Sequence, residues 1–204
     1  VKPSHRALGL AARARNKARG TADSDAREED YRQVRLSANE VYNASMRATV
    51  ARHVGAQVGF TSRLADFWAD HFTTIARDFA QRHLVTSFVE EAIRVHIDGS
   101  FVDMMQSVMT HPMMLLYLQQ VQSVGPESRI GKRTGRGINE NLAREMLELH
   151  TVGVDGSYTQ ADVRELAELL TGLTYQSQRG FFYDERFAEP GAETVMGVTY
   201  DAAD

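Results

Sequence analysis

The feature that most constrains the fold of this chain is an apolar periodicity of about 3.6 residues, which recurs between glycines and prolines. Strict alternation, the period of a half-buried strand, occurs only near residues 180–200, where Pro190-Gly191 is expected at a hairpin turn. The sequence therefore predicts a mainly α protein, a multi-helix orthogonal bundle with a small C-terminal β-hairpin. The expected helices cover about residues 30–58, 64–72, 84–97, 101–110, 112–121, 138–151 and 159–172.

Local signals support several of these helices. Ser100 is expected to cap the helix at 101–110, and Thr159 with Asp162 forms an approximate capping box before the last helix. The longest expected helix contains no proline, and its apolar residues are expected to face a core. These residues are Val34, Val41, Met46, Val50 and Val54.

Composition excludes several classes of protein. The chain has 204 residues, 43% hydrophobic and 25% charged, as in ordinary globular proteins. It has no cysteine, which excludes thiol catalysis, zinc fingers and iron–sulfur sites. A net charge of −4 gives no bulk electrostatic argument for nucleic acid, so no nucleic-acid partner is expected. No apolar run approaches the roughly 18–20 residues of a membrane span.

The N-terminal end differs from the rest in charge. Residues 1–19 contain six lysines and arginines and no acid, and no apolar stretch of the signal-peptide type follows them. We expect a basic N-terminal segment over residues 1–29 and a single helical domain over residues 30–204. The compartment stays open between cytoplasmic and exported, and so does the oligomeric state.

The densest polar pattern lies in the expected helix 138–151. Its apolar face is formed by Ile138, Leu142, Met146 and Leu149. At about 100° per residue, Glu145 and Glu148 lie on an adjacent stripe, with Glu145 at the apolar border. A carboxylate at that border is expected to be partly desolvated, so it needs a cation, a metal or a hydrogen-bond donor.

Several residues are candidate partners for these carboxylates. Arg144 is spaced to neutralise Glu140 or Glu148, one turn away on either side. For Glu145, the expected partner comes from another helix and is Arg94, His71 or His96. Imidazoles with a carboxylate also suit a divalent metal, for which His71, His96 and Glu145 are the candidates. No HExxH or ExxH spacing supports that site.

Residues 123–137 form an expected loop, with four glycines and four basic side chains. The spacing does not fit a phosphate-binding loop of the GxxxxGK[ST] type. We expect few apolar anchors there and hence a mobile, solvated loop. An anion site before the next helix is the alternative.

Longer stretches of the chain resemble one known family. They are FWADHF (67–72), EEAIRVH (90–96), HPMMLLYL (111–118), the run from Arg136 to Gly172 and PGAETVMG (190–197). Together they are similar to a bacterial family of uncharacterised proteins, the domain-of-unknown-function 1800 family, over about residues 60–200. Gln119-Gln120 departs from the Asp-Asn common in the family, and Leu173 departs from its usual Trp. The family's characteristic polar positions correspond here to Trp68, His71, Glu91, Arg94, His96, Asn139, Glu140, Asn141, Arg144, Glu145, Glu148 and Asp162.

The resemblance implies no activity, because the family has no established one, and it suggests that this chain is the N-terminal part of a longer protein. Two hypotheses follow from the residues. In the first, the protein is a metal-assisted or acid–base hydrolase with Glu145 as base or ligand. Glu148 and His71 assist it, and Arg94 or Arg144 stabilises charge. In the second, it is a non-enzymatic interaction or scaffold domain with a structural polar network, in which residues 117–125 and the basic loop meet a protein partner.

Overall fold

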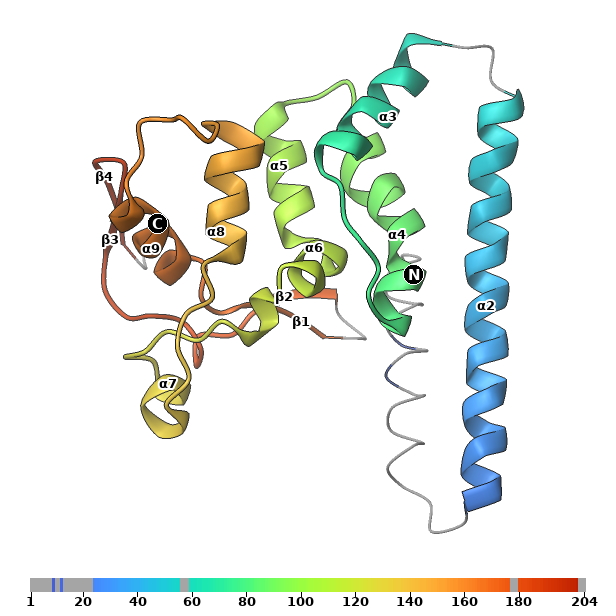
Figure 1. Ribbon diagram of the computed structural model, residues 1–204, viewed down its shortest axis with the longest axis horizontal. Coiled ribbons are helices and arrows are strands. Elements are labelled where there is room, and N and C mark those ends of the chain that lie inside the picture. Colours follow the sequence, from blue (N-terminus) through green and yellow to red (C-terminus); the bar gives the residue numbers. More distant parts are fainter. Residues whose placement is uncertain (1–8, 10–11, 13–23, 56–58, 177–179, 202–204) are drawn as a thin grey trace. The chain divides into compact units, whose positions relative to one another are not determined.

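The computed structural model describes residues 9, 12, 24–55, 59–176 and 180–201 (Figure 1). It is mainly α with small β elements, as predicted. The chain forms two compact units, one of residues 1–113 with 176–180 and one of residues 114–175 with 181–204. Most of the predicted basic segment 1–29 lies outside the described residues. Among the described residues, no helix combines the length and apolar character that a membrane span requires.

The first unit is helical around an apolar core. Phe72, Leu84 and Phe88 are buried in that core. Asp78 caps α4 by accepting from the Gln81 N–H, and Ser100 caps α5 as predicted, by accepting from the Val102 N–H. The elements are α2 (Ser24–Gly55), α3 (Phe60–His71), α4 (Phe79–Phe88), the π-helix η1 (Val89–Ile93), the 3-10 helix η2 (Arg94–His96) and α5 (Phe101–Thr110).

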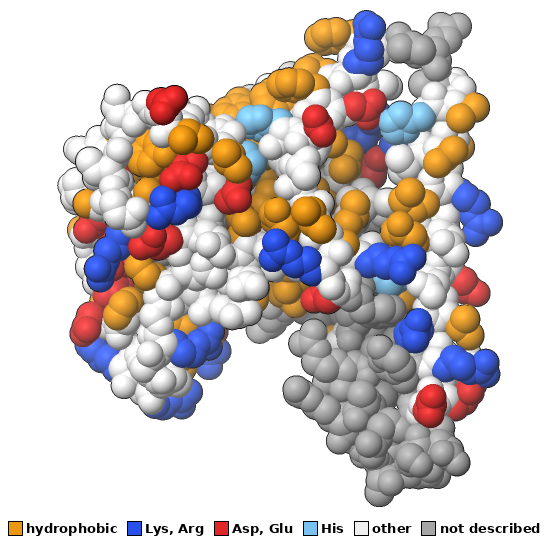
Figure 2. Space-filling model, viewed as in Figure 1, with side chains coloured by type: hydrophobic (Ala, Val, Ile, Leu, Met, Phe, Trp, Pro, Cys, Tyr) orange, Lys and Arg blue, Asp and Glu red, His pale blue; other side chains and the backbone are white. Residues whose placement is uncertain are grey.

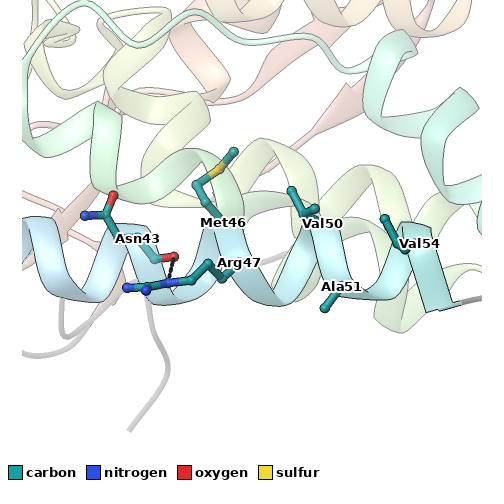
Figure 3. A pocket seen from close by; sticks show the side chains of 6 residues that line it. All are labelled: Asn43, Met46, Arg47, Val50, Ala51 and Val54. Carbon is teal, nitrogen blue, oxygen red and sulfur yellow. Dashed lines mark hydrogen bonds between the residues drawn. The ribbon is translucent and has the colours of Figure 1, made fainter.

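Three of the five apolar residues predicted to face a core along α2 are exposed, so the prediction is wrong for these three. Val41 is half-buried, and the side chain of Val34 lies outside what the structure describes. Met46, Val50 and Val54 are 36%, 55% and 81% exposed. They line an open groove of about 620 Å³ on one face of α2, together with Asn43, Arg47 and Ala51 (Figure 3). The face toward α4 carries small and polar residues instead, among them Ser45, Thr49 and Arg52.

The second unit contains short helices and two small sheets. Its core includes Ala143, Leu147, Val163 and Val195. The helix predicted over 112–121 ends early, because Gln119 adopts a left-handed conformation with φ 59°. The elements are α6 (Pro112–Tyr117), in which the chain passes between the units, η3 (Gln120–Gln122), α7 (Arg129–Thr134), α8 (Asn141–Glu145), the π-helix η4 (Met146–Thr151), α9 (Gln160–Leu169), β1 (Leu173–Gln176), β2 (Gly180–Tyr183), β3 (Glu193–Val195) and β4 (Val198–Tyr200).

The predicted C-terminal hairpin is confirmed, but not its turn. β3 and β4 pair antiparallel with Val195 opposite Val198, so the turn is Met196-Gly197 and not Pro190-Gly191. Both turn residues have positive φ, 50° and 81°, as a type I′ turn requires. The predicted capping box of α9 is present, and its Asp162 also accepts from the Met196 N–H at 2.6 Å. The start of α9 therefore holds the hairpin turn as well as its own first amides.

Candidate functional site

The polar motif at 139–150 is built on a helix that changes its winding. α8 is α-helical to Glu145, and η4 continues as a π-helix to Thr151. Hydrogen bonds in a π-helix join residues five apart, so one extra residue enters the turn and the buried face shifts. Leu147 and His150 are consequently buried, whereas Leu149, predicted on the apolar face, is 55% exposed.

Arg144 is the centre of a charged network in this motif. Its guanidinium donates to the Glu148 carboxylate at 2.7 Å, the Glu140 carboxylate at 3.0 Å and the Gln160 side-chain oxygen at 2.9 Å. Gln160 in turn donates to Glu140 at 2.9 Å. Hydrogen bonds to Glu148 and Glu140 hold the pKa of Arg144 above its ordinary value. Since Gln160 begins α9, the network joins α8 and η4 to the next helix.

Glu145 is half-buried, as the sequence predicts, with its side chain 29% exposed. Burial raises the pKa of its carboxyl, and the nearby charge of Glu148 raises it further. Its histidine neighbour is His150, whose Nε2 lies 4.0 Å from the Glu145 carboxylate. This neighbour comes from the same helical segment, because the π-turn aligns residues five apart. A regular α-helix would separate them by about 140°, which is why sequence reasoning missed it.

The remaining predicted site residues lie in the first unit. His71 is half-buried among aromatic rings, with ring centroids 5.4 Å from Trp68 and 4.7 Å from Phe72. Arg94 lies 3.8 Å from the Glu90 carboxylate, and His96 is half-buried in η2. The structure thus brings Arg144 and Glu148 together, and Glu145 near His150. A joint site of these residues with His71, Arg94 and His96 stays a prediction.

The described residues also bear on the metal hypothesis. No group of three or more His, Cys, Asp or Glu side chains among them is placed to hold a metal ion. The carboxylates nearest to Glu145 in sequence, Glu140 and Glu148, are engaged by Arg144. A divalent metal held by His71, His96 and Glu145 stays a prediction.

Sequence reasoning missed a buried pair in the first unit. His111 Nε2 lies 3.7 Å from the Glu91 carboxylate, and the two side chains are only 5% and 10% exposed. His111 Nδ1 accepts from the Met113 N–H at 3.1 Å, so the ring proton is on Nε2, facing Glu91. Through this hydrogen bond His111 caps the start of α6. The sequence signal for it is a histidine directly before Pro112, where a helix is expected to begin.

The predicted glycine-rich loop at 123–137 is better anchored than expected. It contains α7, and backbone hydrogen bonds join Gly125 to Phe187 at 2.8 Å and Ile130 to Arg186 at 3.0 Å. The loop therefore has hydrogen-bonded anchors that the sequence did not predict, and its mobility stays a prediction. The adjoining apolar edge 117–125 was expected to meet a partner, but Leu118 and Val124 in it are buried.

The chain matches a known protein family over nearly its whole length. Residues 3–204 match the family described as proteins of unknown function, DUF1800, and the chain belongs to this family. No curated protein matches the sequence. No solved structure matches it either.

Proposed function

We propose that the protein is a non-enzymatic interaction domain in which the polar motif at 139–150 is structural. The observation that supports this best is the bonding of Arg144, which holds Glu140 and Glu148 on its own helix and Gln160 on α9. Such mutual satisfaction is what half-buried charges need in order to stabilise a fold. It leaves Arg144 and Glu148 engaged with each other, while exposed cations around α7 are available to a protein partner.

A second function, acid–base hydrolysis, is favoured by Glu145 alone. Its raised pKa is typical of a general acid. The like charge of the neighbouring Glu148 contributes to this shift, as in sites where two carboxyl groups have different pKa values. In that reaction Glu145 would transfer the proton, and Arg144 would stabilise developing negative charge. A divalent metal, if bound, would polarise the scissile bond or activate water.

One set of variants separates the two functions. Arg144→Ala, Glu148→Gln and Glu145→Gln are compared with Glu40→Gln, an exposed glutamate on α2. Free energies of unfolding come from urea titration, and hydrolysis is assayed with chromogenic carboxylic and phosphate esters. We expect Arg144→Ala to lose about 1–2 kcal/mol and no variant to change hydrolysis. Wild-type hydrolysis that disappears in Glu145→Gln without a loss of stability would establish the enzyme instead.

A further inference from the structure

The side of the second unit around α7 carries a concentrated positive charge, which we call the basic surface. It consists of Arg129, Lys132, Arg133 and Arg136, all exposed, and Figure 2 shows Lys and Arg side chains gathered over α7 at the lower left. Lys132 pairs with Glu127 at 3.2 Å, and Arg136 donates to the Gln122 carbonyl at 2.7 Å. Within the described residues, neither Arg129 nor Arg133 has an ion-pair partner.

The helix that presents these cations is closely packed on its other side. Gly131 lies about 200° around the helix from both Arg129 and Arg133. A Cβ at Gly131 would come within 2.1 Å of the Gly125 carbonyl oxygen and 2.7 Å of the Pro126 oxygen. Glycine is therefore required on the packed side. The two arginines project from the opposite, solvent side.

Hydrogen bonds to residues 186–189 fix the position of this helix. The Ile130 N–H donates to the Arg186 carbonyl at 3.0 Å, and the Glu127 N–H donates to the Glu189 carboxylate at 3.0 Å. Ser128 caps α7 by accepting from the Gly131 N–H at 3.0 Å, and Gly135 ends it with φ 69°. The cations are thus held on an ordered support, which reduces the entropy lost when a partner binds.

We propose that the basic surface binds an acidic helix of a partner protein, one with carboxylates four residues apart. Arg129 and Arg133 are themselves four residues apart, about 6 Å along the helix axis, which matches that carboxylate spacing. Guanidinium groups recognise carboxylates through paired, charge-assisted hydrogen bonds. This inference rests on the proposed interaction function and names the chemistry of the partner.

Two other anionic partners match the surface less well. Residues 123–137 contain no aromatic side chain for stacking on bases, and the net charge of the chain is −4, which disfavours a polyphosphate. Val124 is buried and Ile130 half-buried, so this segment presents no exposed apolar side chain to insert into a lipid surface. Carboxylates on a protein helix need neither feature.

The test is binding of the full chain to a fluorescein-labelled, alanine-based helical peptide with glutamates four residues apart, followed by anisotropy at low salt. The same peptide with glutamines is the reference, and it should bind at least tenfold more weakly. Arg129→Glu/Arg133→Glu should weaken binding of the glutamate peptide at least tenfold, and Arg129→Gln/Arg133→Gln by less. The matched control Arg47→Glu/Arg63→Glu changes the net charge equally at exposed positions elsewhere. It should retain affinity within about twofold.

Equal binding of the two peptides, or an equal loss in the control, overturns the proposal. Tighter binding to phosphatidylglycerol vesicles or to a DNA duplex, abolished by the same two substitutions, also overturns it in favour of those partners. Far-ultraviolet circular dichroism checks that each variant is folded. If the glutamate peptide does not bind as expected, only the proposal of an acidic helical partner is ruled out. Wild-type hydrolysis that is lost in Glu145→Gln would instead rule out the proposed non-enzymatic interaction function.

Discussion

The two π-helical segments place similar residues in different surroundings. In η1, the Glu91 carboxylate lies 3.7 Å from His111, both side chains are buried, and neighbouring Glu90 pairs with Arg52 and Arg94. In η4, Glu148 pairs with Arg144, while half-buried Glu145 lies 4.0 Å from His150. The histidine next to Glu91, His111, lies twenty residues further along the chain, at the start of α6. The histidine next to Glu145, His150, lies in the same helical turn. The difference indicates that the pair at η1 joins separate elements, while burial and the charge of Glu148 raise the pKa of Glu145.

The largest expected effect is at the buried pair. Glu91→Ala removes the buried carboxylate that lies 3.7 Å from the His111 Nε2, and removing one partner of a buried ion pair is costly. We expect the free energy of unfolding to fall by about 2–4 kcal/mol, measured by urea denaturation. The exposed Glu40→Gln is the control. A loss below that of a typical surface substitution, about 0.5 kcal/mol, would remove the contrast between the two segments.

The next comparison is between the two variants Arg144→Ala and Arg94→Ala. Arg144 is bonded to both Glu140 and Glu148, whereas Glu90 has two arginines, Arg52 and Arg94. Arg144→Ala should therefore cost about 1–2 kcal/mol, and Arg94→Ala under about 0.5 kcal/mol, because Glu90 keeps Arg52. Thermal and urea unfolding of both variants measure this. Equal losses in the two variants would show that Arg52 does not compensate for the loss of Arg94 at Glu90.

The substitution of Glu145 is expected to have a small effect of the opposite sign, a gain in the free energy of unfolding. The pKa of this carboxyl is raised in the folded state, so the folded chain binds that proton more tightly than the unfolded chain. Below the ordinary value of 4.5 the group costs nothing, and stability is lost as pH rises from there through the folded pKa. At neutral pH, Glu145→Gln should therefore raise the free energy of unfolding, and at pH 4 it should leave it unchanged, as urea denaturation at the two pH values measures. A loss of stability at neutral pH would reveal a partner that the charge of Glu145 requires.

Local signals predicted much of the fold. Ser100 and the Thr159–Asp162 capping box could be read from sequence because each cap depends on residues within one helical turn. The exposure of Met46, Val50 and Val54 on α2 could not be predicted, because apolar residues at helical spacing do not show which face of the helix a neighbouring helix will cover. Here α4 packs on the side of Ser45 and Thr49.

The candidate site was predicted only in part for a related reason. The pairing of Arg144 with Glu140 and Glu148 follows from helical spacing. The approach of His150 to Glu145 depends on one extra residue in the turn, which a fixed period of 100° does not reveal. The Glu91–His111 pair joins residues twenty positions apart and depends on how the elements pack.

The central claim, that the motif at 139–150 joins helices and is structural, is tested most directly by a double-mutant cycle between Arg144 and Gln160. These side chains belong to α8 and α9 and are 2.9 Å apart. Free energies of unfolding of the wild type, Arg144→Ala, Gln160→Ala and the double variant isolate their interaction. We predict a favourable coupling of about 0.5–1 kcal/mol. A coupling of zero would contradict the claim.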